Sequence, residues 1–207
     1  MAIRNIILDL GGVLLNLDIP RTFTAFEQLG VTDFQQYYQQ SYSNPLFARL
    51  EKGACTPEEF YEDFRATTGL KATDQAIADA WNAMLLDFRT ESMAYLQTLR
   101  NQYRVFLLSN TNEIHLRAFR QIHYEQFGHH GFDDLFEKAW YSHELGLRKP
   151  DVPCYTEVLA RHQLSGAETL FVDDTPVNIE GAKKAGLVTG FLPKGATIEE
   201  LVPGWLA

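Results

Sequence analysis

The sequence predicts an α/β protein in which a doubly wound parallel sheet carries a small all-helical insertion. Two observations carry this prediction. Beyond residue 90, short apolar runs alternate with amphipathic helical patterns, which is typical of a parallel sheet covered by helices on both faces. Residues 16–89 interrupt this alternation with helical spacing and no convincing strand, which indicates a separate helical unit.

The expected strands are short apolar runs, several of them rich in β-branched side chains. In chain order they span residues 3–8, 104–108, 137–141, 169–172 and 187–192. Amphipathic helices are expected between the later strands, at residues 92–102, 113–127, 152–163 and 177–185. Because right-handed crossovers connect parallel strands, these helices should cover both faces of one sheet.

The helical insertion is expected to span residues 16–89, between the first two strands, so that residues 1–15 and 90–207 form the core domain. About four helices fit its length. One helix start is explicit, because Thr56 precedes Pro57 and Glu59. A threonine cap, a proline at the first position and a glutamate at the third form a capping box.

The composition narrows the functional classes. The chain of 207 residues carries 18 basic and 27 acidic residues, a net charge of -9, which argues against a general nucleic-acid surface. No window approaches the ~20 apolar residues of a membrane span, and no leader pattern opens the chain. Cys55 and Cys154 lie far apart without a metal-binding pattern and are expected to be reduced thiols. We therefore expect a cytoplasmic monomer or homodimer that binds neither nucleic acid nor membrane.

Polar residues follow three of the expected strands at the point where each strand ends. They are Asp9, Ser109 with Asn110, and Asp173 with Asp174. Each alone could be an ordinary turn or helix-cap residue. Ligands of open α/β sheets bind outside the carboxyl ends of the strands, so together these residues predict one cleft.

The acidic residues of this cleft suit a magnesium ion. Mg²⁺ prefers one or two carboxylates together with waters and substrate phosphate oxygens. Asp9 with Asp174 or Asp173 supplies such a pair. A carboxylate beside the metal can also attack phosphorus and form an aspartyl-phosphate, which makes Asp9 a candidate nucleophile.

The charge on a transferring phosphoryl group must be held by fixed donors and cations. Candidates are the Ser109 hydroxyl with its neighbour Asn110, the backbone N–H groups of Gly11 and Gly12, and the ammonium group of Lys149. The expected partner is therefore a small phosphorylated metabolite, and the expected cofactor is Mg²⁺.

Four motifs follow one another along the whole chain: DLGGVL from Asp9, LLSNTN around Ser109, LGLRKP around Lys149, and FVDDTPVNIEGAKKAG with Asp173 and Asp174. In this order the chain resembles the haloacid dehalogenase-like (HAD) hydrolases, which have a Rossmann-like core. It is most similar to a helical-cap subgroup that includes bacterial glucose-1-phosphate phosphatases. The resemblance implies that residues 16–89 are the cap.

The resemblance also implies individual roles. Asp9 would be both the nucleophile and a metal ligand. Ser109 and Lys149 would bind the phosphoryl group during catalysis. Asp174 would contact Mg²⁺ directly, and Asp173 would be a further ligand or would accept hydrogen bonds beside the metal.

Gly11 and Asn178 complete the implied site. The backbone carbonyl of Gly11 would contact the metal, and Asn178 would orient a metal-bound water or a neighbouring carboxylate. Most phosphatases of this superfamily have a second aspartate at the Gly11 position, which protonates the leaving oxygen and then activates water. General acid–base help is worth ~100- to 10,000-fold in rate, so its absence matters.

Three explanations of Gly11 compete. The substrate could have a weakly basic leaving oxygen, as the anomeric oxygen of a sugar 1-phosphate does. Another group could substitute, with Asn16, Asp18, Glu113 and His115 as candidates. The protein could instead be a weak or inactive relative. The similarity to active sugar-phosphate phosphatases favours the first two explanations.

Other functions remain as alternatives. A 2-haloacid dehalogenase also uses an aspartate nucleophile, but it needs no metal and no acidic pair such as Asp173 and Asp174. A phosphomutase relies on an acid–base aspartate at the Gly11 position. A binding or regulatory module need not retain a nucleophile such as Asp9.

The segment of residues 43–53 joins two expected helices of the insertion and could reach the cleft. Phe47, Arg49, Glu51 and Lys52 are its candidate substrate contacts. If the segment closes over the substrate, it would exclude water from the reaction.

Overall fold

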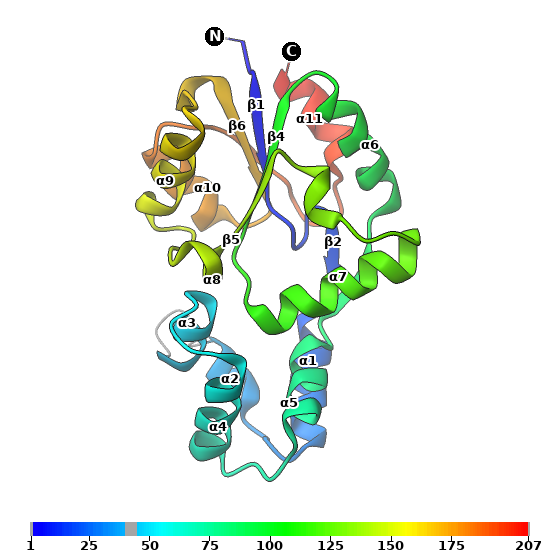
Figure 1. Ribbon diagram of the computed structural model, residues 1–207, viewed down its shortest axis with the longest axis vertical. Helices are drawn as coiled ribbons and strands as arrows, with labels where there is room; N and C mark the ends of the chain where they lie inside the picture. The colour runs from blue at the N-terminus through cyan, green and yellow to red at the C-terminus, as the bar shows by residue number, and fades with distance from the viewer. Residues whose placement is uncertain (1, 40–44, 207) are drawn as a thin grey trace.

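The computed structural model describes residues 2–39 and 45–206 and has a five-stranded parallel sheet at its centre (Figure 1). Its strands are, in chain order, β1 (Asn5–Leu8), β4 (Arg104–Ser109), β5 (Lys138–Tyr141), β6 (Thr169–Asp173) and β7 (Val188–Phe191). They lie side by side in the order β5-β4-β1-β6-β7. The predicted doubly wound fold and its five strands are confirmed.

Alternate side chains along the strands pack into two hydrophobic cores, one on each face of the sheet. Ile6 and Leu8 belong to the core beneath α6, α7 and α11, whereas Ile7 belongs to the core beneath α9 and α10. The bounds of these helices are α6 (Thr90–Arg100), α7 (Glu113–Phe127), α9 (Val152–His162), α10 (Pro176–Lys184) and α11 (Ile198–Leu206). Shorter pieces are α8 (Ser142–Leu145), η1 (Phe132–Leu135) and η2 (Gly166–Glu168). Within the described residues no helix has both the length and the apolar character that a membrane span requires.

The order of the strands reverses at β1, which makes the carboxyl end of β1 the topological switch point of the sheet. Leu8, near that end, pairs with Leu107 of β4 and with Val172 of β6. The three strands therefore end at nearly the same level. Whatever follows them in sequence is brought together at one edge.

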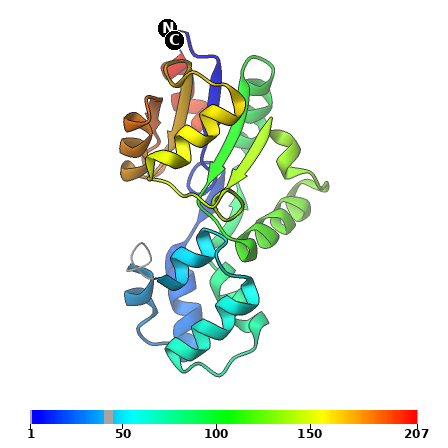
Figure 2. The ribbon, with the colours of Figure 1, turned by 60° about the vertical axis from the view of Figure 1, so that its left-hand side comes forward.

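Five helices among the described residues lie beyond that edge (Figures 1 and 2). They are α1 (Ile19–Gln28), α2 (Phe34–Gln39), α3 (Pro45–Glu51), α4 (Pro57–Thr68) and α5 (Asp74–Asn82). Aromatic side chains fill their common core. The rings of Phe26 and Phe34 stack 4.0 Å apart, and those of Phe47 and Trp81 stack 5.2 Å apart. The segment thus has a hydrophobic core of its own.

One expectation about this segment was wrong. Residues 16–89 contain strand as well as helix, because β2 (Leu15–Leu17) and β3 (Leu85–Phe88) form an antiparallel pair at the two ends of the insertion. Both strands are short, their sequences lack β-branched residues, and their partners are distant in the chain. Pairing of this kind leaves no local pattern for sequence reasoning to detect.

The predicted capping box at the start of α4 is present. Thr56 Oγ1 accepts a hydrogen bond from the N–H of Glu59, and the Glu59 carboxylate accepts one from the N–H of Thr56. Replacing Thr56 with alanine should cost about 1 kcal/mol of stability. Thermal unfolding should then occur roughly 2–4 °C lower, because this is the shift per kcal/mol for chains of this size.

The matched control is Thr67→Ala, which removes an exposed threonine from the same helix. It should be neutral or slightly stabilising, because alanine is the better helix former. Equal unfolding temperatures for the two variants would mean that the capping box does not stabilise the protein.

Candidate active site

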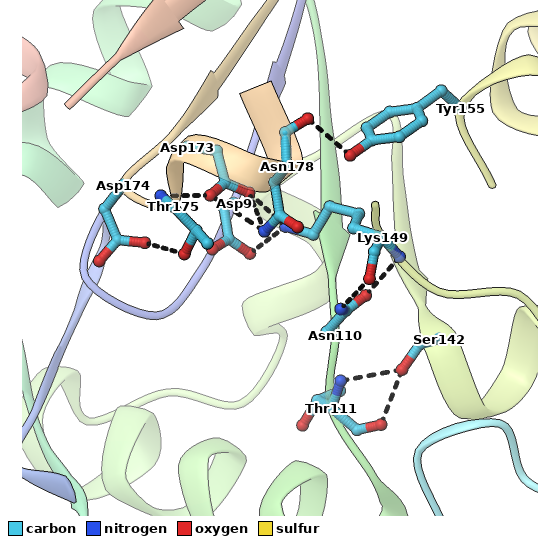
Figure 3. A network of polar contacts seen from close by, with 10 residues as sticks. All are labelled: Asp9, Asn110, Thr111, Ser142, Lys149, Tyr155, Asp173, Asp174, Thr175 and Asn178. Carbon is cyan, nitrogen blue, oxygen red and sulfur yellow. Dashed lines mark hydrogen bonds and ion pairs between the residues drawn. The ribbon is translucent and has the colours of Figure 1, made fainter. Parts of the chain in front are cut away.

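Three carboxylates meet at the switch point of the sheet (Figure 3). Asp9 directly follows β1, Asp173 is the last residue of β6, and Asp174 comes next. Each offers an oxygen that lies within 4.8 Å of the oxygens offered by the other two. Asp9 and Asp173 are buried, and Asp174 is half-buried. Three negative groups this close together require positive charge nearby.

Lys149 supplies part of that charge from the loop after α8. Its Nζ atom lies 2.7 Å from Asp9 Oδ1 and 2.7 Å from Asp173 Oδ2, and its side chain is 1% exposed. Burial lowers the pKa of Lys149, but the charges of Asp173 and Asp9 more than reverse this effect and raise it overall. The lysine is therefore a permanent buried cation between the two aspartates.

Asp173 is held from several sides. The side-chain amide of Asn178 donates to both of its oxygens at 3.1 Å, and the N–H of Thr175 donates to Oδ1 at 2.8 Å. Tyr155 in turn donates from its hydroxyl to the carbonyl oxygen of Asn178. Asn178 and Thr175 thus hold Asp173 while it pairs with Lys149. Asn178 does contact a neighbouring carboxylate, one of the two roles expected of it.

The turn after Asp9 brings the backbone of Gly12 close to the carboxylate of Asp174, which follows β6. Gly12 has a φ of 73°, and a Cβ atom on it would lie only 2.0 Å from Asp174 Oδ2. Only glycine therefore allows this approach without a rearrangement. The N–H of Gly12, a predicted phosphate donor, donates instead to the carbonyl oxygen of Leu15 at 2.8 Å.

The carboxylates of the site have perturbed proton affinities. Burial raises the pKa of Asp9 to about 7, with Lys149 opposing the rise and Asp173 adding to it. Burial and the charge of Asp173 likewise raise the pKa of Asp174. Strongly shifted groups that share a cleft are typical of a catalytic or metal-binding site.

These residues fit a magnesium ion. The three carboxylates offer oxygen atoms, which are the ligands that Mg²⁺ prefers, and among the described residues Lys149 is the lysine that pairs with Asp9 and Asp173. Asp9, Asp174 and the carbonyl group of Gly11 are the groups that would hold the metal. Asp173 would support them through Lys149.

A cavity of about 130 Å³ opens beside this cluster. Gly11, Ser109 and Asn110 form its wall on the sheet side, and Glu51 and Trp81 form part of its wall on the helical side. Ser109, at the end of β4, is buried and faces this space. Of the predicted phosphate-binding residues, Gly11, Ser109 and Asn110 thus border a space suited to a small molecule, whereas Gly12 and Lys149 are not among the residues that line it.

The side chain of Asn110 has a structural task. Its amide donates to the carbonyl oxygen of Lys149 at 2.8 Å, and its oxygen accepts from the Lys149 N–H at 2.9 Å. This pair of hydrogen bonds fixes the backbone of the lysine loop against β4.

Sequence reasoning missed part of the cavity wall. Trp81 stacks on His115 with ring centroids 4.9 Å apart, and His115 Nδ1 lies 2.8 Å from Asn82 Oδ1. Burial lowers the pKa of His115 to about 3, so the ring is neutral. Trp81 gave no local signal, because only the packing of α5 against α7 brings it to the cavity.

The segment that we expected to reach the cleft is only partly in contact with it. Residues 43 and 44 lie outside the described residues. Phe47 is buried in the aromatic core, and Arg49 forms an ion pair on the surface of the helical segment. Glu51 does line the cavity, and Lys52 Nζ lies 3.9 Å from Asp151 of the core domain.

The comparison with known families decides the class of protein. The model of the haloacid dehalogenase-like hydrolase family matches residues 3–186. The chain belongs to the haloacid dehalogenase-like hydrolases. The family that the four motifs resemble is therefore confirmed.

Relatives of this HAD hydrolase include named enzymes. It is 29% identical to a D-ribitol-5-phosphate phosphatase of Bacteroides thetaiotaomicron, over 90% of each chain. A HAD family enzyme of the same organism, solved with magnesium and inorganic phosphate, is 33% identical with a TM-score of 0.87, covering 96% of this chain and 98% of that one.

A more distant structure shares the fold alone. The L-2-haloacid dehalogenase of Xanthobacter autotrophicus, with chloropropionic acid covalently bound, has a TM-score of 0.62 and 21% identity. The match covers 99% of this chain and 84% of that chain. The nearer relatives agree with the predicted phosphatase class and the predicted Mg²⁺ cofactor.

Proposed function

We propose that this hydrolase removes the phosphoryl group of a small phosphorylated metabolite through an aspartyl-phosphate on Asp9. The enzyme is a HAD phosphoric monoester hydrolase, and its cofactor is Mg²⁺. The observation that carries the mechanism is the buried Lys149 between Asp9 and Asp173, with Asp174 beside them. A 2-haloacid dehalogenase has no use for the second acidic pair.

Each residue of the site has a distinct role in the proposed reaction. An oxygen of Asp9 attacks phosphorus, while Lys149 and the Ser109 hydroxyl hold phosphoryl oxygens. Bound Mg²⁺ supplies further positive charge as the phosphoryl group transfers. Asp173 and Asn178 keep the lysine in position. Residues 1–15 and 90–207 act as the catalytic core in this proposal, and residues 16–89 act as a cap.

The substrate is, in this proposal, a sugar or sugar-alcohol phosphate, with sugar 1-phosphates included. The cavity of about 130 Å³ is well below the ~300–1,000 Å³ of sites for drug-sized ligands, which favours a small leaving group. A named relative is a D-ribitol-5-phosphate phosphatase, which supports a polyol leaving group.

A panel of phosphorylated metabolites tests the proposal. We expect phosphate release in Mg²⁺, fastest with sugar and polyol phosphates, and a loss of at least ~100-fold when a chelator removes the metal. Added Mg²⁺ should restore the rate. Activity that survives the chelator, or halide release from 2-haloacids in its place, would contradict the proposal.

A further inference from the structure

One carboxylate at the cavity has no part in the reaction described so far. Glu51 is the last residue of α3, and it borders the same cavity as Gly11 and Ser109. It reaches this position because α3 packs against α8 of the core domain (Figure 1). The contact there is tight, since a Cβ atom on Gly53 would lie 2.0 Å from the carbonyl oxygen of His143.

The surroundings of Glu51 suit a group that exchanges protons. Arg148 Nη1 lies 2.9 Å from Glu51 Oε2 as an ion pair, at an angle outside that of a hydrogen bond. The side chain of Glu51 is 23% exposed and that of Arg148 is 6% exposed. Burial raises the pKa of Glu51, an effect that the charge of Arg148 partly opposes. Arg148 precedes Lys149, so this contact also joins the helical segment to the phosphate-binding loop.

The other candidates for a missing acid are less suited. Asn16 is hydrogen-bonded to Arg89, and Asp18 pairs with an arginine in an exposed position. Glu113 likewise pairs with an exposed arginine on its own helix. His115 borders the cavity, but burial lowers its pKa to about 3, so at neutral pH the ring lacks the acidic imidazolium proton that a general acid needs.

We propose that Glu51 is the general acid and base of this enzyme, supplied by α3 in place of the aspartate that Gly11 lacks. The inference rests on the proposed phosphatase function. Gly11 has no carboxylate to offer, and Glu51 lines the same cavity as Gly11 and Ser109 from its helical side. The carboxyl group therefore comes from the helical segment and not from the nucleophile loop.

The Glu51 carboxyl group can serve both half-reactions, as the acid in the first and the base in the second. In the first, Asp9 attacks phosphorus, the bond from phosphorus to the ester oxygen breaks, and protonated Glu51 gives its proton to that oxygen. In the second, a water attacks the aspartyl-phosphate and loses a proton to the Glu51 carboxylate. The bond from phosphorus to Asp9 breaks, which releases phosphate and regenerates both starting groups.

A Glu51→Gln variant compared on two leaving groups tests this role. A polyol phosphate releases a basic alkoxide, whereas p-nitrophenyl phosphate releases a phenolate that needs no proton. The first turnover of the polyol phosphate should slow ~100- to 10,000-fold, because general acid help is lost. The burst of nitrophenolate should change by less than about threefold, because that step gains little from an acid.

Glu62→Gln, which changes an exposed carboxylate on α4, should leave both rates unchanged. A loss in Glu51→Gln that is equal for the two substrates would mean that Glu51 only holds the helical segment in place. That result would overturn the proposal.

Restoring the missing aspartate gives an independent test. A Cβ atom on Gly11 would meet only the tip of the exposed Leu17 side chain, at 2.6 Å, and Gly11 is not among the glycines with positive φ. Gly11→Asp should therefore fold. It should raise polyol phosphate turnover about tenfold or more in the Glu51→Gln background, and by less than about threefold in the parent enzyme.

Equal gains in the two backgrounds would show that Glu51 does not fill the role. If Glu51→Gln does not fold, a large gain from Gly11→Asp in the parent would still overturn the proposal. A parent enzyme without Mg²⁺-dependent phosphatase activity would instead remove the proposed function itself, and this inference with it.

Discussion

Replacing Asp9 with asparagine should lower the rate of phosphate release by on the order of 10⁴-fold or more, because the amide cannot attack phosphorus. Asn is nearly isosteric with Asp, and the buried cation Lys149 would still have Asp173 as a partner at 2.7 Å. The fold should therefore persist. Steady-state release of inorganic phosphate in saturating Mg²⁺ measures the loss.

The matched control is Asp33→Asn, which makes the same chemical change at an exposed position before α2. It should retain the parent rate. Asp9→Asn with more than a few per cent of parent activity would mean that another group attacks phosphorus. Beryllofluoride should bind to the parent enzyme as a mimic of the aspartyl-phosphate and should not bind to Asp9→Asn.

Lys149→Met should damage both activity and stability. The variant keeps the bulk of the side chain and removes the cation that lies between Asp9 and Asp173. Breaking a buried ion pair by removing one partner costs ~3–5 kcal/mol, which would lower the unfolding temperature by roughly 10 °C. Loss of one fixed charge that holds the phosphoryl group should reduce kcat by ~100- to 1,000-fold.

The stability deficit should depend on pH in a defined direction. Lys149 lowers the pKa of Asp9, so its removal should raise that pKa further above about 7. A carboxyl group whose pKa is raised in the folded state destabilises the fold as the pH rises through that value. The deficit should therefore be largest above neutral pH and should shrink as the pH falls.

Lys183→Met is the control for this variant. Lys183 pairs with Glu180 on the surface, where an ion pair contributes ~0–1 kcal/mol. Scanning calorimetry of both variants, with and without Mg²⁺, compares the loss of the buried ion pair with the loss of the surface ion pair. Equal unfolding temperatures would mean that the buried pair contributes no more than a surface pair.

The residues that sequence analysis placed together share one property, which is their position at the end of a parallel strand. Asp9, Ser109 and Asp173 could be placed together without a structure because parallel strands end at a common edge. The apolar runs that precede them fixed the fold class for the same reason, since burial on both faces leaves a clear local pattern.

The residues that sequence analysis could not place come from the other side of the cavity. Trp81 reaches it only because α5 packs on α7, and Glu51, which sequence analysis named only as one of four candidate contacts, reaches it because α3 packs on α8. Helix-on-helix packing of this kind depends on the whole arrangement of side chains and not on the spacing within one helix. The pairing of β2 with β3 escaped prediction because it joins two distant segments.

The pairing of β2 with β3 also affects how the length of the helical segment can change. Leu17 pairs with Leu85, and the N–H of Asp18 donates to the carbonyl oxygen of Met84 at 2.9 Å, so the chain leaves and re-enters the core domain at adjacent points. The segment between these points contributes no strand to the five-stranded sheet. A change in the length of this segment therefore need not shift the register of the sheet that positions Asp9.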